Sequence, residues 1–251
     1  MMIVVTMLKG GTGKTTIAMN LAAELAKRGR TAVVELDYQQ AASTVLGLHN
    51  THSLADLMDN AAKLSDTLVK YSDNFYVLPS GGRMMDIERT ILGYPDKMFR
   101  FKELVSALKK AIEYVVVDTH PDSGVLTTLA LAQADIAVVV TKPGIQNTVS
   151  VERTMKVLSN VMYENKKLKV VIVNNLVREG TKIGQSSLHI ISKRYGDKVS
   201  KVVIPMATLF ERAEVDKKPL VVAYPDRREA GLFVDLVDEI MSRGTKMEAV
   251  A

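Results

Sequence analysis

The sequence predicts a doubly wound α/β domain, in which helices cover both faces of a mainly parallel β-sheet. Short apolar runs rich in β-branched residues alternate with helical patterns, as in successive βαβ units. Most of these runs are continuously apolar, which is typical of strands that are covered on both faces. No internal repeat, low-complexity tract or linker divides the chain, so we expect one domain over residues 1–251.

The individual elements follow from these runs and from helical spacing. A helix over Thr15–Lys27 follows a glycine-rich loop, and Leu104, Leu108 and Ile112 recur at one-turn spacing within a second helix, Phe101–Ile112. A third helix, Glu229–Arg243, gathers its apolar residues on one face. The expected strands are Ile3–Leu8, Thr31–Leu36, Phe75–Leu78, Tyr114–Val117, Ile136–Thr141, Val170–Val173 and Val202–Ile204.

The glycine-rich loop between the first strand and the first helix is a phosphate-binding motif. Its glycines let the backbone wrap around phosphate oxygens, and the following helix points the positive end of its dipole at the same anion. Lys14 supplies a cation for the β- and γ-phosphates, and Thr15 a hydroxyl for Mg²⁺. The predicted nucleotide contacts are Lys9, Gly10, Gly11, Thr12, Gly13, Lys14, Thr15 and Thr16.

This loop departs from the usual pattern G-x-x-x-x-G-K-[ST] at its start. Leu8 stands where that pattern has glycine, and Lys9 follows it, which gives K-G-G-x-G-K-[ST]. A loop folded around one nucleotide has little room for two lysines on the same phosphates. We therefore predict that Lys9 reaches a second nucleotide across a dimer interface.

Two acidic residues follow strands that are expected to lie beside the loop. Asp37 comes just after the second strand, and Asp118 ends the apolar run Tyr114–Val117, as in a Walker B motif. Carboxylates at this edge of the sheet orient water or hold Mg²⁺ and its water shell. We predict catalytic roles for Lys9, Lys14, Asp37 and Asp118, and metal binding by Thr15, Asp37 and Asp118.

On these residues the chain resembles the ParA/MinD group of deviant Walker A ATPases, from Met1 to about Arg243. In that group the first lysine of the loop contacts the nucleotide of the partner subunit. The group reads D-x-D-P-Q at the second strand, so Asp37 corresponds to its hydrolytic acid, while Glu35 and Tyr38 replace the first Asp and the Pro. His120 falls where the group often has Pro, and we expect no chemical role for it.

The resemblance also implies an adenine contact after the sixth strand. A carboxamide offers a donor and an acceptor to the base. Asn174 aligns best with the group's asparagine, and Asn175 is the other candidate. Pro205 lies in a segment similar to the group's I-P…E-A stretch, whose backbone runs along the base. The implied cofactors are ATP and Mg²⁺.

Composition narrows the function further. The chain contains no cysteine, which excludes disulfides and the cysteine-held clusters of iron–sulfur relatives. Residues 165–228 hold 14 Lys/Arg against 6 Asp/Glu, a local net charge of +8, which indicates a face for polyanions such as DNA. The candidate DNA contacts are Lys193, Arg194, Lys198, Lys201, Arg212, Lys217, Lys218, Arg227 and Arg228.

The function predicted from all of this is DNA partition by a ParA-type ATPase. An ATP-bridged homodimer would bind DNA non-specifically, and a centromere-binding, ParB-like protein would stimulate its slow hydrolysis. The chain begins at the first strand, so we expect a small form without an N-terminal helix-turn-helix domain, cytoplasmic and associated with the nucleoid.

Several alternatives share the loop. A MinD-like ATPase would anchor to membranes by a terminal amphipathic helix, but Glu229, Asp235, Asp238 and Glu239 make the polar face of this one acidic, and the tail Gly244–Ala251 is not basic. ATPases that position another cargo stay open as an alternative. No motif points to the small-molecule pocket of a dethiobiotin-synthetase-like enzyme, and the Tyr-rich tail of a tyrosine autokinase is absent.

Overall fold

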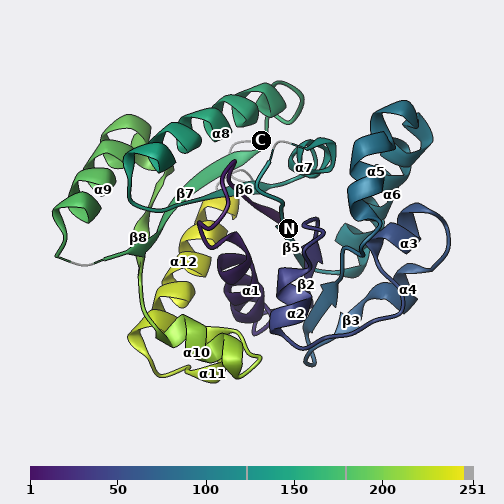
Figure 1. The fold of residues 1–251 in the computed structure, drawn as a ribbon, viewed down its shortest axis with the longest axis horizontal. Coiled ribbons are helices and arrows are strands. Elements are labelled where there is room, and N and C mark those ends of the chain that lie inside the picture. The colour runs from purple at the N-terminus through teal and green to yellow at the C-terminus, as the bar shows by residue number, and fades with distance from the viewer. Residues whose placement is uncertain (123, 179, 246–251) are drawn as a thin grey trace.

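The strands of the computed structural model form one sheet with β1 near its middle. The structure describes residues 1–122, 124–178 and 180–245. Within them, the 8-stranded sheet has the order β3-β4-β2-β5-β1-β6-β7-β8 (Figure 1). All neighbouring strands are parallel except β3 and β4. The predicted doubly wound α/β fold is thus confirmed.

All seven predicted strands are present, with bounds that shift by a few residues at most. An additional strand, β3, is antiparallel to β4 at the edge of the sheet and is two residues long, too short for a sequence pattern. The strands are β1 (Met2–Thr6), β2 (Thr31–Glu35), β3 (Val69–Lys70), β4 (Phe75–Leu78), β5 (Tyr114–Asp118), β6 (Ile136–Thr141), β7 (Lys169–Val177) and β8 (Val199–Pro205).

Helices cover both faces of the sheet, as continuously apolar strands require. On one face lie α3 (Leu54–Met58), α4 (Leu64–Thr67), α5 (Met84–Thr90), α6 (Pro95–Ala111), α7 (Val125–Leu131), α8 (Ile145–Glu164) and α9 (Lys182–Tyr195). On the other lie α1 (Lys14–Leu25), α2 (Ala41–Val45), α10 (Leu209–Val215), α11 (Leu220–Ala223) and α12 (Arg228–Thr245). Short 3₁₀ helices span Ile91–Gly93 and Gly196–Lys198.

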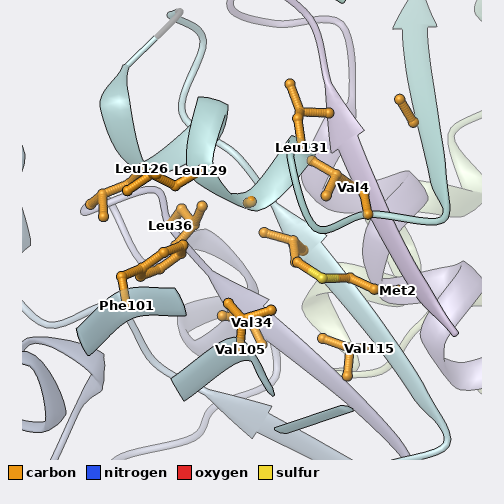
Figure 2. Packing of buried hydrophobic residues seen from close by; sticks show 14 of the residues in the cluster. Met2, Val4, Val34, Leu36, Phe101, Val105, Val115, Leu126, Leu129 and Leu131 are labelled. Atoms are coloured by element: carbon orange, nitrogen blue, oxygen red, sulfur yellow. The ribbon is translucent and has the colours of Figure 1, made fainter. Parts of the chain in front are cut away.

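Side chains alternate along β1 and so divide the core into two layers. Met2 and Val4 face the α6 and α7 side, whereas Ile3 and Val5 face α1 and α12. Figure 2 shows the first layer, where strand residues meet Phe101 of α6 and the leucines of α7. Both layers are fully buried, so the central strands hold their carboxyl ends in a fixed arrangement.

The C-terminal helix α12 packs as predicted. Phe233, Leu236, Val237 and Ile240 are each 0% exposed, in the layer that includes α1 and β8. The apolar face of the helix is therefore occupied by the body of the protein. No helix among the described residues has the length and apolar character needed to cross a membrane. Most of the predicted tail, residues 246–251, lies outside the described residues.

Candidate active site

The glycine-rich loop joins the carboxyl end of β1 to α1 and has the backbone of a phosphate cradle. Gly11 and Gly13 have φ angles of 66° and 88°, in the left-handed region where a side chain causes strain. Gly13 also has no space for one, because a Cβ atom there would lie 2.2 Å from Nδ2 of Asn175. The loop therefore depends on glycine at both positions, and such a backbone turns its N–H groups toward an anion.

Lys14 begins α1, and its side chain is buried inside the loop. Its Nζ donates a long hydrogen bond, 3.4 Å, to the carbonyl oxygen of Lys9. Burial lowers the pKa of Lys14, while the carboxylates of Asp118 and Asp37 act in the opposite direction. A buried ammonium group is costly without a strong partner. The loop thus offers its cation to an incoming anion such as a phosphate.

Thr15 and Asp118 bring a hydroxyl and a carboxylate together beside the loop. Asp118 ends β5 and is paired in register with Val5 of β1. This pairing places Asp118 beside the loop that follows β1. Thr15 Oγ1 donates to Asp118 Oδ2 over 2.7 Å. Burial raises the pKa of Asp118 to about 7, although the bond from Thr15 and the charge of Lys14 oppose this rise.

Two buried oxygen atoms in this region, Asp118 Oδ1 and Thr12 Oγ1, have no hydrogen-bond partner among the described residues. Such atoms are costly unless they meet a ligand. They lie where the motif requires Mg²⁺ and phosphate, so the residues fit these groups. The described residues contain no cluster of three His, Cys, Asp or Glu side chains suited to a metal. A Mg²⁺ ion would therefore use the Thr15 hydroxyl, Asp118, phosphate oxygens and water, as this ion often does.

Asp37 lies in a turn just beyond β2, and β2 is paired with β5 so that Glu35 is opposite Asp118. The Oδ1 atom of Asp37 accepts the backbone N–H of Gln39 over 3.0 Å. The carboxylate is only partly buried, and its charge contributes to the pKa values of both Lys14 and Asp118. The structure thus brings Asp37 to the same site as the loop and Asp118.

Glu35 binds the start of the helix that follows the Asp37 turn. Its side chain is 0% exposed, and Oε1 accepts the backbone N–H groups of Ala42 and Ser43 over 2.7 and 3.1 Å. The other oxygen, Oε2, accepts the hydroxyl of Ser43. Burial raises the pKa of Glu35, and these hydrogen bonds act against that rise. Glu35 therefore anchors α2, the helix that follows the Asp37 turn.

Lys9 points away from the phosphate cradle. Its Nζ donates to Oε1 of Gln146 on α8 over 3.3 Å. The neighbouring Ile145 and Val149 of α8 are 85% and 43% exposed. Lys9 and Lys14 thus leave the same loop in different directions, and Lys9 reaches a surface that carries exposed apolar side chains.

The two asparagines after the sixth predicted strand lie on different sides of β7. Asn175 Nδ2 donates to the carbonyl oxygen of Thr12 over 2.8 Å, so this side chain supports the loop. Asn174 shares the opposite face with Ile172, by alternation along the strand. Asn174 is buried, and Pro205 ends β8 opposite Val177. Adenine recognition by Asn174 and Pro205 stays a prediction.

Sequence reasoning missed Lys142, which follows β6. A Cβ atom on Gly11 would lie 3.8 Å from its Nζ, so a third lysine stands at the mouth of the loop. Position 142 belongs to no phosphate-binding pattern, and only the parallel pairing of β6 with β1 brings it there. The signal available in the sequence was a polar residue directly after an apolar strand.

The nine predicted DNA contacts divide into two groups along the chain, one around the start of β8 and one after its end. The group at its start comprises Lys193, Arg194, Lys198 and Lys201; the group after its end comprises Arg212, Lys217, Lys218, Arg227 and Arg228. All nine are exposed, and Arg194 forms an ion pair of 2.8 Å with Glu152. The second group lies toward the carboxyl edge of the sheet, where the phosphate loop also lies. Lys198 and Lys201 of the first group and Arg228 of the second line the same hollow beside β8 and α12.

Comparisons with known proteins identify the family of this chain. A family model described as "AAA domain" matches residues 1–172. The sporulation initiation inhibitor protein Soj of Bacillus subtilis is 28% identical over 96% of this chain and 98% of its own length. The chromosome partitioning protein ParA of Caulobacter vibrioides is 26% identical, over 97% of this chain and 94% of its own.

Solved structures share the fold across the chain. McdA of Cyanothece, as an aspartate-to-alanine variant in complex with ATP, has a TM-score of 0.84 and 16% identity, covering 96% of both chains. A Mycobacterium smegmatis structure described as cobyrinic acid a,c-diamide synthase, with a bound ATP analogue and magnesium, has a TM-score of 0.82 and 22% identity, covering 98% and 96%. The likeness to these structures confirms the fold. The chain belongs to the AAA-domain family that its first 172 residues match, and within it to the ParA-type P-loop ATPases.

Proposed function

We propose that this protein binds ATP with Mg²⁺, forms an ATP-bridged dimer, binds DNA non-specifically in that state, and segregates plasmid or chromosomal DNA with a centromere-binding, ParB-like partner. The observation that carries the proposal is the direction of Lys9. This lysine extends to Gln146 on α8, away from the Lys14 cradle in its own subunit. The kinship with Soj and ParA supports the same function.

Each residue of the site has a separate proposed role. Bound ATP supplies the phosphoanhydride bond, and Mg²⁺ neutralises charge on its phosphates. Lys14 and the loop backbone hold the phosphates, and Thr15 with Asp118 holds the metal. Asp37 orients the attacking water from the end of β2. Lys9 of one subunit contacts the nucleotide of the other, so that the site is complete only in the dimer.

The surface around Lys9 supports this arrangement. Ile145 and Val149 are exposed on α8 beside Gln146, the residue that Lys9 contacts. Exposed apolar side chains around a polar contact are typical of a surface that becomes buried on association. A second copy of the chain, bridged by two nucleotides, would bury them.

A MinD-like function is less well supported. It requires a membrane anchor, and Phe233, Leu236, Val237 and Ile240 of α12 are buried in the layer that includes α1 and β8. An ATPase that positions another cargo would use the same dimer and the same DNA surface. A DNA-partition ATPase and an ATPase that positions another cargo therefore differ in their partner and not in the chemistry of this site.

Light scattering with ATP and Mg²⁺ tests the dimer. Asp37→Ala should trap the dimer, because it retains the phosphate contacts and loses the group that orients water. Lys9→Ala, alone or combined with Asp37→Ala, should still bind ATP but stay monomeric. Lys110→Ala removes an exposed lysine from the last turn of α6 and is the matched control. A Lys9→Ala protein that dimerises with ATP like the control would contradict the proposal.

The DNA step is tested by a mobility shift with random-sequence duplex DNA. Binding should require ATP and should be the same for unrelated sequences, and trapping by Asp37→Ala should strengthen it. The proposed DNA function is wrong if the trapped dimer leaves the DNA unshifted at low salt.

A further inference from the structure

Two aromatic rings meet just beyond the ends of β2 and β5. The ring centroids of Tyr38 and His120 lie 4.6 Å apart, and their planes are inclined by 22°, which is a stacked contact. Tyr38 directly follows Asp37, and His120 follows Asp118 by two residues. The stack therefore joins the two segments that carry the carboxylates of the site.

Tyr38 occupies a position where a turn needs restraint. Asp37–Gln40 forms a β-turn in which the N–H of Gln40 donates to the carbonyl oxygen of Asp37 over 3.0 Å. Tyr38 is the second residue of this turn, where proline is favoured because its ring fixes φ. The ParA/MinD pattern has Pro at this place. Tyrosine leaves φ free, so the Asp37 turn depends on restraints outside its own backbone.

His120 belongs to a segment that is tied to the sheet. The neighbouring Thr119 is buried, and its hydroxyl donates to the carbonyl oxygen of Val5 over 2.9 Å. The imidazole is mostly buried, and its Nδ1 lies 3.0 Å from Oδ2 of Asp122, at an angle that does not make a hydrogen bond. His120 therefore places its ring beside Tyr38 from a segment whose backbone is held to β1 through Thr119.

We propose that the Tyr38–His120 stack is a positioning device that holds the Asp37 turn against the segment after Asp118, in place of the restraint that proline supplies in the ParA/MinD pattern. The inference rests on the proposed role of Asp37 in hydrolysis. Tyr38 and His120 act through Asp37 and are positioning residues. Losing the stack lets the turn sample other conformations, and only a fraction of molecules then hold the carboxylate in place.

Steady-state kinetics of the full chain with ATP and Mg²⁺ test this. A stacked aromatic pair biases such an equilibrium by about 2- to 10-fold. Tyr38→Ala and His120→Ala should each lower kcat by about that factor and leave the affinity for ATP unchanged, because the loop is intact. Tyr38→Phe keeps the ring and should retain kcat. Tyr163→Ala, which removes a tyrosine 82% exposed on α8, is the control.

The double variant separates coupling from two independent effects. If the rings act only through each other, Tyr38→Ala combined with His120→Ala should be no slower than either single variant. Multiplied effects would overturn the proposal, and so would wild-type kcat in Tyr38→Ala. A loss of ATP affinity equal to the loss of kcat would also overturn it, because the stack would then serve the whole site.

Fluorescence reports the contact without any turnover. The chain contains no tryptophan, so Tyr38→Trp introduces a single tryptophan, located at the stack. Its emission should change when His120→Ala is added, both without nucleotide and with Mg²⁺ and a non-hydrolysable ATP analogue. Emission that is indifferent to His120, or that loses this dependence when the analogue binds, would show that no stack positions Asp37 in the reactive state.

The two proposals fail in different ways. Unchanged hydrolysis in Asp37→Ala would refute the role of Asp37 itself. An inactive Asp37→Ala protein beside a fully active Tyr38→Ala protein would refute only the stack.

Discussion

Replacing Asp118 by asparagine removes a carboxyl group that can carry charge from a deeply buried position in the site. Burial raises the pKa of this carboxyl group from 3.8 to about 7 when no metal is bound, against the hydrogen bond from Thr15 and the charge of Lys14. In the Asp118→Asn variant, the side-chain oxygen still accepts the Thr15 hydroxyl. The variant is therefore a neutral stand-in for protonated Asp118, and comparing it with wild type isolates the cost of ionising this group.

The raised pKa determines how the free energy of unfolding changes with pH. In the unfolded chain Asp118 loses its proton near its ordinary pKa, whereas the folded, metal-free protein holds it until about pH 7. Its contribution to the free energy of unfolding is thus fully present below about pH 4 and is lost as the pH rises through about 7. At roughly 1.4 kcal/mol per pH unit, the full loss is about 4 kcal/mol.

Urea unfolding in EDTA, from about pH 4 to 8.5, measures this loss. The free energy of unfolding of wild type, minus that of Asp118→Asn, should fall by about 4 kcal/mol across the range and level off above about pH 8. Adding Mg²⁺ and ATP should stabilise wild type more at high pH than at low pH, since the metal needs the ionised carboxylate. Parallel pH profiles for the two proteins would refute the reasoning.

Three further predictions concern the loop and the DNA surface. Asn175→Ala removes the bond to the Thr12 carbonyl and should cost about 1–3 kcal/mol in ATP affinity, measured by calorimetry. Lys142→Ala should weaken ATP more than AMP, because its ammonium group lies at Gly11; equal weakening of both would contradict a phosphate contact. In mobility shifts of the trapped dimer, Arg212→Ala with Lys217→Ala, or Lys193→Ala with Arg194→Ala, should weaken all sequences equally and reduce the slope of log K against log salt by about 0.9 for each phosphate that is no longer neutralised. Altered sequence preference, or an unchanged slope in both pairs, would exclude these residues as phosphate contacts.

The fold and the centre of the site could be predicted because their signals are local. Each of the seven predicted strands contains a contiguous apolar run, and the loop from Lys9 to Thr16 is a contiguous motif whose geometry follows from its glycines. Asp118 was predictable because an acid at the carboxyl end of a parallel strand lies at the same edge of the sheet as the loop after β1. The ends of the strands are less sharply encoded, and β7 and β8 both extend beyond the predicted ranges.

The other contacts at the site depend on tertiary geometry that no local pattern carries. The pairing of β7 with β8 has register shifts between Ile172 and Val177, and Leu176 has a φ of 53°. Motif alignment favours Asn174, but alternation along the strand points Asn175 at the loop. Lys142 reaches Gly11 only because β6 pairs with β1, on the side opposite β5. Which of these polar residues contacts the loop depends on the strand register of the folded sheet.

The departures from the ParA/MinD pattern in the second strand are best understood together. Glutamate at position 35 is one methylene longer than the aspartate of the pattern, and it reaches the N–H groups of Ala42 and Ser43 at the start of α2. Tyrosine at position 38 lacks the fixed φ of proline, and its ring stacks on His120. His120 is itself at a position where the pattern often has proline. The segment between β2 and α2 is thus held at its base by Glu35 and at its turn by the stack. Since Asp37 lies between these two anchors, the replaced residues preserve its position by side-chain contacts instead of backbone rigidity.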